Sequence, residues 1–480
     1  MTKKQEKGIT AKKSENFSEW YTQIIQKGEI AEYTGVSGCM VIRPYAYEMW
    51  EKVQEFFNKE LKKMGIKNAY FPSLIPEHLL NKEKEHVKGF NPEVAWVTHA
   101  GNTKLSERLA IRPTSETVMY DVYKKWVQSH NDLPILINQW CNIIRWEFKH
   151  PTPFLRSREF LWQEGHTVHV TEKEADRLAM KILKSYAKVF EELYAVPVFQ
   201  GRKSQKEKFA GANYSISVET FFPDGKAIQG GTSHGLGQNF AKAFGIRFTD
   251  KNEKKQYPWQ TSWGISTRGL GIMYAMHGDD KGLVIPPMIA PIQVVIVPII
   301  FEDTKDETLK KAKEISKSLG SIRKELDLRE NYSPGWKFNQ WEMKGVSLRI
   351  EVGPRDMENK QVVMVRRDTG EKYTVKEKDV KKKTRELLKE IQKNIFDKAK
   401  KFINDNIVKT DDFDALKSVI KAKKMAFSPW CGEVDCEEWI KDKTGGAKSI
   451  NIPFNQKDPK KKCVQCNNKA KFYAYFAKSY

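Results

Sequence analysis

Apolar residues recur at the spacing of an amphipathic helix in two long segments of the chain. Between residues 46 and 64 they recur at helical spacing, at 49, 50, 53, 56, 57, 61 and 64. A second segment of this kind lies within residues 172–194. Side chains three and four apart share one face of an α-helix, so both segments are predicted to be helices packed on a core.

Runs typical of β-strands lie around these helices. Residues 66–71, 133–146, 166–170 and 214–222 are rich in β-branched and aromatic side chains. Helices and strands alternate irregularly over roughly the first 285 residues. This pattern favours an α+β domain with antiparallel strands over regular βαβ repeats.

The proline-rich segment VIPPMIAP, residues 284–291, marks a boundary after this first domain. Behind it, residues 293–300 form a continuous apolar run, which is typical of a strand buried on both faces. A helix is predicted over residues 304–319, and two strands over 347–352 and 361–366. This order predicts a small α/β domain.

A long, highly charged helix is predicted from residue 375 to about 407, because Leu387, Ile391 and Ile395 recur on one face. The last 70 or so residues then hold four of the six cysteines. We therefore expect a flexible basic tail at 1–15, a first domain at 16–285, a second at 286–400 and a small C-terminal α+β domain at 401–480.

The charge balance favours polyanionic partners such as nucleic acid. The 480 residues include 83 Lys and Arg against 61 Asp and Glu, a formal net charge of +22. A hydrophobic content of 40% excludes wholesale disorder. Charge does not determine the fold.

Neither a membrane nor a secreted location is expected. The most apolar stretch, residues 289–301, is interrupted by Pro291, Gln293 and Pro298, so it is too short and too broken to span a bilayer. The first twenty residues contain no apolar signal segment. Six cysteines in a chain of this length do not make a disulfide scaffold, so the predicted location is the reducing cytoplasm.

Two cysteine pairs near the C-terminus have the spacing of a zinc site. Cys431 and Cys436 lie in CGEVDC, and Cys463 and Cys466 lie in CVQC. Zinc takes four thiolates tetrahedrally, and such a site is structural because no coordination position stays open for water. The alternative is four unrelated buried thiols.

A set of arginines stands among the strands of the first domain. Arg145 ends an apolar strand, where a guanidinium is unfavourable unless it meets an anion. Arg156 and Phe160 follow the turn HPTPF and could return toward Arg145 to hold phosphates and stack a base, while Arg268 offers a third cation. The set suggests nucleotide binding without a phosphate loop; the alternative is a group of surface salt bridges.

These motifs resemble the signatures of class II aminoacyl-tRNA synthetases. RWE at 145–147, a turn and RSREF at 156–160 are similar to the second signature of that class, residues 65–72 to the first, and Arg268 to the arginine of the third. RPTSE, FLWQEGHT, EKFAGA, QGGTSH and GPRD, in this order, resemble the prolyl-tRNA synthetase family over roughly residues 17–480. The likeness is to the archaeal and eukaryotic-type branch without an inserted editing domain.

The resemblance implies a fold and a reaction. Residues 16–285 would form the antiparallel-sheet catalytic domain, 286–400 the α/β anticodon-binding domain and 401–480 a zinc-binding-like domain. L-proline and ATP would give prolyl-adenylate and pyrophosphate, and the prolyl group would then pass to tRNA(Pro) with release of AMP. Magnesium, structural zinc and a homodimer are also implied.

The family pattern also implies roles for single residues. Arg145 would bridge the proline carboxylate and the α-phosphate, and Arg156 and Arg268 would hold the γ-phosphate end. The remaining nucleotide and magnesium contacts would come from Glu147, Phe160, Gln229, Thr232 and Ser266. Proline would be held by Thr114 and Glu116 beside its ammonium and by walls from Trp162, Phe209 and His234.

In the second domain, Glu351 and Arg355 of EVGPRD are the candidates for contacts with the proline anticodon, because unstacked RNA bases expose polar edges. The alternative is that both residues merely cap strands.

Two other functions compete with this hypothesis. The chain could be a different class II enzyme, such as a threonyl or glycyl synthetase, but those have other residues in place of TSE. It could also be a synthetase-like RNA-binding or regulatory protein. Such a protein would be expected to have lost Arg145, Glu116 or Arg268, and all three are present.

Overall fold

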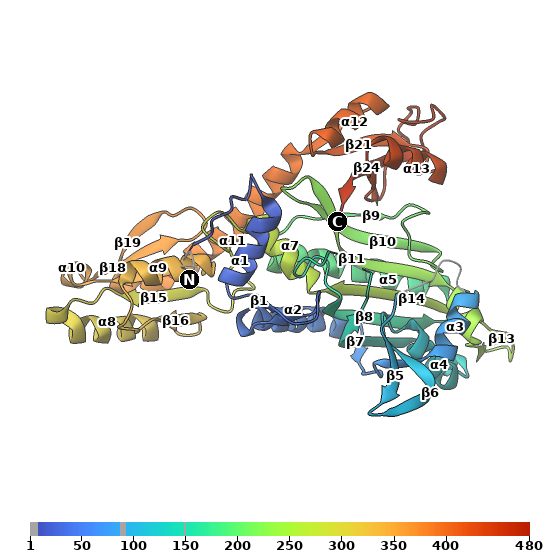
Figure 1. Cartoon of the computed structure of the whole chain (residues 1–480), viewed down its shortest axis with the longest axis horizontal. Coiled ribbons are helices and arrows are strands. Elements are labelled where there is room, and N and C mark those ends of the chain that lie inside the picture. Colours follow the sequence, from blue (N-terminus) through green and yellow to red (C-terminus); the bar gives the residue numbers. More distant parts are fainter. Residues whose placement is uncertain (1–7, 87–92, 148–149) are drawn as a thin grey trace.

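The computed structural model describes residues 8–86, 93–147 and 150–480 (Figure 1). Residues 1–7 of the predicted flexible tail lie outside this part. Residues 8–15 are described, and Lys13 Nζ donates to the carbonyls of Met276 and Gly278 at 3.0 and 2.7 Å. This half of the tail is therefore anchored on the first domain. No helix of the described residues is long and apolar enough to cross a bilayer.

An antiparallel sheet forms the centre of the first domain, as the α+β prediction requires. Its strands run in the order β11, β14, β8 and β7, with β10 paired to the other side of β11. Their bounds are Lys226–Gly237, Trp259–Ser266, Glu159–His169, Ile135–Ile144 and Tyr214–Phe221. Smaller pieces add β9 (Phe199–Arg202) and β3 (Lys67–Asn68) to the edges.

Helices cover this sheet and continue its core. The amphipathic helix α5 (Glu172–Lys188) packs across β8, β10, β11 and β14 and begins at a capping box formed by Thr171 and Glu174. The other helices of the domain are α1 (Phe17–Lys27), α2 (Pro44–Lys63), α3 (Glu77–His86), α4 (Glu116–Trp126), α6 (Asn239–Phe244) and α7 (Arg268–His277). Two short sheets, β1–β2 (Ala31–Tyr33, Met40–Ile42) and β4–β6–β5 (Leu74–Pro76, Thr103–Ile111, Trp96–Ala100), lie beside them.

Most predicted elements of this domain are confirmed, and the differences have local causes. The helices predicted at 46–64 and 172–194 appear as α2 and α5, the latter ending in a π-helical turn at Val189–Leu193. The strand predicted at 166–170 is part of β8, which begins seven residues earlier. Its first half, EFLWQ, has three apolar residues in a row between two polar ones, so it lacks the strict alternation that marks a half-buried strand. The strand predicted at 66–71 shrinks to β3.

The second domain is a separate five-stranded sheet in the order β16, β15, β17, β18 and β19. The strands span Lys324–Leu326, Val294–Pro298, Leu348–Val352, Gln361–Arg366 and Lys372–Lys376. The helices are α8 (Lys305–Ser318), α9 (Pro334–Met343), α10 (Pro354–Glu358) and α11 (Val380–Asp405). The long charged helix starts later than predicted because residues 372–376 pair with β18 as β19.

The C-terminal domain joins the sheet of the first domain through its last strand, β24, and through a short pairing of β23 with β9. It contains β20 (Ile407–Lys409), α12 (Phe413–Lys421), β21 (Met425–Trp430), α13 (Val434–Lys443), β22 (Lys448–Ser449), β23 (Ile452–Pro453) and β24 (Phe472–Ser479). β24 pairs antiparallel with β21 and, at Lys478 and Ser479, parallel with Lys226 and Ala227 of β11. One continuous sheet therefore runs from the C-terminal domain into the catalytic domain (Figure 1).

A glycine in β8 allows the closest packing inside the catalytic sheet. A Cβ atom added at Gly165 would lie 2.0–2.2 Å from the indole of the buried Trp263, which faces it from β14. We expect Gly165→Ala to destabilise the protein by about 1–3 kcal/mol, because the core has no room for a methyl group. Urea unfolding should show a lower midpoint with an unchanged slope.

Gly335→Ala is the matched control. Gly335 lies exposed near the start of α9 and has no atom within 4 Å of its added Cβ. Helix propensity alone should leave this variant as stable as the parent or slightly more stable. Equal effects of the two substitutions would contradict the packing argument.

Candidate functional site

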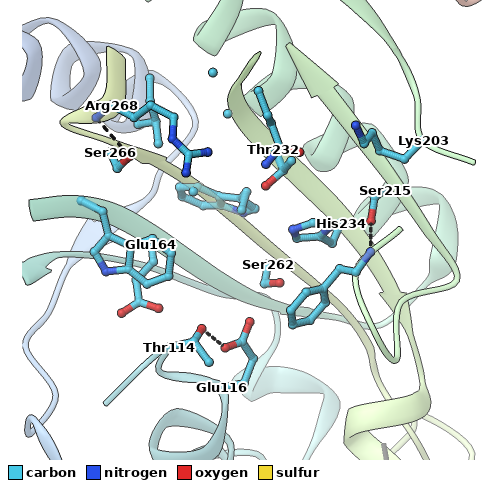
Figure 2. Close-up of a pocket in the computed structure, with 18 of the residues that line it drawn as sticks. Thr114, Glu116, Glu164, Lys203, Ser215, Thr232, His234, Ser262, Ser266 and Arg268 are labelled. Atoms are coloured by element: carbon cyan, nitrogen blue, oxygen red, sulfur yellow. Dashed lines mark hydrogen bonds between the residues drawn. The ribbon is translucent and has the colours of Figure 1, made fainter. Parts of the chain in front are cut away.

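One cavity of about 270 Å³ brings together most of the residues predicted from the motifs (Figure 2). It lies on the catalytic sheet, between β8, β11 and β14 and the start of α4. Eleven predicted residues line it: Thr114, Glu116, Arg145, Phe160, Trp162, Phe209, Gln229, Thr232, His234, Ser266 and Arg268.

The alternation of side chains along β8 explains why these residues meet. Successive residues of a strand point to opposite faces. Gln163 faces α5, where its side-chain amide lies 2.7 Å from the Tyr186 hydroxyl. Trp162, Glu164 and His166 therefore face the cavity, opposite Ser266, Gly264 and Ser262 of β14.

This alternation also identifies residues that the motifs did not. Glu164, His166, Ser262, Lys203 and Ser215 line the cavity as well, and none was assigned a role from sequence. Glu164 and His166 lie two and four positions after Trp162. Extending the period of two from that residue would have found both.

A group of three arginines gives one side of the cavity its positive charge. Burial, together with the positive charges of Arg145 and Arg156, lowers the pKa of Arg268 to about 10. Arg145 donates through Nε to the Pro113 carbonyl at 2.9 Å and lies over the rings of Trp162 and Phe160, at 5.5 and 5.8 Å from their centroids. Three mutually repelling cations favour a multiply charged anion between them.

Arg156 lies just outside the lining of this cavity. It borders a neighbouring pocket together with Tyr480, whose ring centroid is 5.9 Å from the guanidinium carbon. Its charge nevertheless acts on Arg268. The structure thus places Arg156 beside the other two arginines, next to the last residue of the chain.

Buried carboxylates occupy the opposite side of the cavity. Glu116 is the first residue of α4 and accepts a hydrogen bond from the Thr114 hydroxyl. Glu164 accepts from Gln139 and lies 3.0 Å from His166. Burial alone would lower the pKa of His166, but Glu116 and Glu164 raise it. Figure 2 shows Glu116 and Arg268 on opposite sides of the cavity.

The third wall is neutral and largely apolar. The rings of Phe209 and His234 lie 4.8 Å apart, and the Ser215 hydroxyl lies 2.7 Å from His234 Nδ1. Burial lowers the pKa of His234 to about 3, so the imidazole stays uncharged at neutral pH. Together with Trp162, this wall can enclose a small apolar group next to a carboxylate.

Besides Arg156, the predicted residues Glu147, Glu351 and Arg355 do not line the cavity. Glu147 is exposed and does not line it, and the following residues 148–149 lie outside the described part. In the second domain, Glu351 is buried in β17 and accepts from Arg349 Nε at 2.9 Å, while Arg355 is exposed in α10. The roles of Glu147, Glu351 and Arg355 stay predictions.

The four C-terminal cysteines form one cluster. The Sγ atoms of Cys431, Cys436, Cys463 and Cys466 lie within 4.8 Å of one another. The Cys431 Sγ is 3.4 Å from that of Cys436 and 3.8 Å from that of Cys466. A tetrahedral zinc with sulfur ligands at about 2.3 Å places the sulfurs about 3.8 Å apart, so the cluster fits this ion.

Three parts of the chain match known families. Residues 96–277 match the tRNA synthetase class II core domain (G, H, P, S and T), residues 293–387 an anticodon binding domain, and residues 413–480 the prolyl-tRNA synthetase C-terminal domain. The core family covers five kinds of synthetase. The C-terminal match is the one that separates the prolyl type from the threonyl and glycyl alternatives.

Similar proteins extend this likeness over the whole chain. A proline--tRNA ligase of Alkaliphilus oremlandii is 50% identical over 97% of this chain and 96% of its own length. Proline--tRNA ligase 2 of Bacillus thuringiensis is 48% identical over 100% of both chains. The bifunctional glutamate/proline--tRNA ligase of Cricetulus griseus is 51% identical over 98% of this chain, which spans only 33% of that relative's length.

The motifs, the antiparallel sheet and the full-length likeness agree with one another. The resemblance predicted from RPTSE, FLWQEGHT and QGGTSH is confirmed, as is the predicted fold of its three domains. The chain belongs to the proline--tRNA ligase family of class II aminoacyl-tRNA synthetases.

Proposed function

We propose that this protein activates L-proline with ATP and transfers the prolyl group to tRNA(Pro), releasing pyrophosphate and AMP. The observation that carries the proposal is the cavity itself. Arg268 and the buried carboxylate of Glu116 lie on opposite sides of it, Arg145 lines it as a second cation, and Phe209 and His234 add a largely apolar wall. A triphosphate and a small amino acid with an apolar ring need these surroundings.

Arg145 contacts both reactants of the activation step. Only its Nε has a hydrogen-bond partner among the described residues, so its outer N–H groups are available to the proline carboxylate and the α-phosphate. The carboxylate is already ionised at neutral pH and attacks the α-phosphorus without a general base. The protein contributes by positioning the reactants and by balancing the charge that builds on the phosphate oxygens.

Arg156 and Arg268 hold the leaving pyrophosphate. Arg268 is fixed by its Nε bond to the Leu155 carbonyl at 3.1 Å, so its guanidinium is oriented before ATP binds. Phe160 stacks the adenine and Glu147 contacts its edge. Magnesium prefers oxygen ligands, and Gln229, Thr232 and Ser266 supply them on the cavity wall; when bound, the ion neutralises phosphate charge.

Proline binds between Glu116 and the aromatic wall. Its secondary ammonium meets the Glu116 carboxylate and the Thr114 hydroxyl, and its ring packs among Trp162, Phe209 and His234. His234 suits this wall because its neutral imidazole does not repel the ammonium. Glu164 supports the pocket through its bond with Gln139 and its contact with His166.

The other domains serve the tRNA and the stability of the fold. The second domain binds the anticodon, with Glu351 and Arg355 as contacts, and the similarity of residues 293–387 to anticodon binding domains supports this. The cysteine cluster holds a structural zinc ion, since four thiolates leave no position for a substrate.

A homodimer and a cytoplasmic location complete the proposal. Six large apolar side chains among the first 75 residues are exposed, namely Tyr33, Val36, Val41, Tyr47, Tyr70 and Leu74, and a second subunit could cover them. The Arabidopsis thaliana relative, 47% identical over 98% of this chain and 91% of its own length, is named cytoplasmic. The six cysteines form no disulfide, which agrees with a reducing compartment.

Proline-dependent exchange of pyrophosphate into ATP, without tRNA, tests the activity directly. We expect exchange with proline, and a loss of about 100-fold or more in Arg145→Ala because a preorganised cation is removed from the reacting phosphate. Arg247→Ala, which changes an exposed arginine outside the cavity, should retain full exchange. Exchange with threonine or glycine instead, or no exchange at all, would overturn the proposal.

The ammonium contact predicts a selective effect on proline. Glu116→Gln keeps the shape of the side chain but removes its charge. We expect KM for proline to rise by about 10- to 100-fold, because a charge-assisted hydrogen bond is lost, while KM for ATP changes little. Steady-state exchange at varied proline and ATP separates the two constants. Equal rises in both would assign Glu116 a merely structural role.

We expect the zinc ion to stabilise the fold and to take no part in the reaction. We expect Cys436→Ser to lower the zinc content measured by atomic absorption and to lower Tm by several degrees, because the ion joins β21, α13 and the loop before β24. Cys39→Ser, which changes a cysteine outside the cluster, is the control. Full metal content in Cys436→Ser would exclude the four-cysteine site.

A further inference from the structure

A cleft lined by lysines lies where the C-terminal domain meets the catalytic domain. Its volume is about 640 Å³. The walls come from the start of α1, the turn between β10 and β11, α12, the end of α13 and β24. Six lysines line this lysine cleft: Lys226, Lys417, Lys421, Lys423, Lys443 and Lys478.

The carboxylates of the lysine cleft do not balance this charge. Only Glu15 and Asp224 line it, and both are engaged. Glu15 pairs with Lys12 at 2.9 Å. Asp224 accepts from the Tyr480 hydroxyl at 2.8 Å and pairs with Lys226 at 3.1 Å.

Four of the six lysines have no acidic partner. Among the described residues, no carboxylate lies within 4 Å of the ammonium groups of Lys417, Lys421, Lys423 and Lys478, and all four side chains are exposed. Lys443 pairs only with its exposed neighbour Asp442, at 3.4 Å. The charge of the cleft is therefore free to act on a ligand.

The fold holds like charges side by side in this cleft. Lys417 and Lys421 are four residues apart on α12, and Lys226 and Lys478 are register partners on the parallel strands β11 and β24. Like charges at both spacings are destabilising, and an anion between them would remove the repulsion. The arrangement is thus one that a bound polyanion stabilises.

Close packing fixes the two walls relative to each other. Gly225 has a φ of +85°, and a Cβ atom added there would lie 2.4 Å from the Lys423 Cβ, so the two domains touch at this point. The Tyr480 amide donates to the Ala227 carbonyl at 3.0 Å on the same side. The lysine cleft is therefore preformed where the C-terminal domain meets the catalytic domain.

The lysine cleft continues into the catalytic region. It shares Phe17, Ser18 and Lys226 with the neighbouring pocket that contains Arg156 and Tyr480. Lys226 Nζ lies 4.6 Å from the centroid of the Tyr480 ring, and Arg156 lies 5.9 Å from it. A path of cations therefore leads from the three arginines of the cavity to the cleft.

We propose that the lysine cleft binds the sugar-phosphate backbone of tRNA and thereby guides the 3′ end to the catalytic cavity. The inference rests on the proposed aminoacylation function and adds a contact surface to it. Exposed lysines on separate elements act as point charges that match spaced phosphodiesters. A site for one small phosphate would instead need buried donors converging on a single point.

The test is a triple variant, K417A/K421A/K478A, which removes three unpaired exposed lysines without touching the Gly225–Lys423 contact or the Tyr480 contacts. K181A/K184A/K251A is the control, because it removes the same charge from exposed lysines of α5 and of the loop between β12 (Phe248–Thr249) and β13 (Lys255–Gln256). Both are compared with the parent in proline-dependent pyrophosphate exchange and in aminoacylation of tRNA(Pro) at several salt concentrations.

We expect the cleft variant to keep the parent's exchange rate and to raise KM for tRNA about tenfold or more at low salt. The salt dependence of log kcat/KM should weaken by up to about three units, one for each lost phosphate contact. The control should move neither quantity by comparable amounts.

The remaining outcomes distinguish a failure of the proposed function from a failure of the cleft proposal. No exchange in the parent would overturn the proposed function itself. Normal exchange with the same tRNA KM and salt slope in both triple variants would overturn the cleft proposal alone. Weaker inhibition by inorganic pyrophosphate, with tRNA kinetics unchanged, would also overturn it by assigning the cleft to a small phosphate.

Discussion

The rest of the site depends on the repulsion among three guanidinium groups. Arg145 and Arg156 stand on either side of one turn and Arg268 lies more than 100 residues later, yet the fold holds all three near one another although their charges oppose it. Backbone carbonyls of Pro113 and Leu155 fix two of the groups. Holding these cations together destabilises the empty site, and a bound triphosphate relieves this repulsion. Affinity for the nucleotide and instability of the empty site therefore have the same origin.

The strand β8 beneath the cavity is polar in its buried half. β8 carries a glutamate, two histidines and two threonine or glutamine side chains in its buried half, where an ordinary strand would carry valine or isoleucine. Hydrogen bonds within the strand layer satisfy these groups, as between Glu164 and Gln139 or between Thr167 and Thr261. One face of the sheet therefore packs on α5 while the other face stays chemically active.

The sequence pattern predicted the helices and strands whose bounds follow from short-range hydrophobic periodicity. The helices α2, α5 and α8 and the strands β7, β10 and β18 appear close to their predicted bounds, because each has a clear apolar face or a continuous apolar run. Helices α4, α7 and α9 were missed. α7 is buried almost throughout, and its glycines conceal any apolar face. Eleven site residues were found in one cavity because ordered motifs identified them, whereas Glu164 and His166 follow only from the alternation of side chains along β8.

The short parallel pairing of β11 with β24 has a consequence for how the protein unfolds. Because the strands of the C-terminal domain extend the catalytic sheet, neither part can lose its fold without exposing a sheet edge of the other. These two parts should melt as one cooperative unit. The five-stranded sheet of the second domain shares no strand with them and is coupled to them by packing contacts, such as those of Ala399 and Ile403 on α11 in the catalytic core.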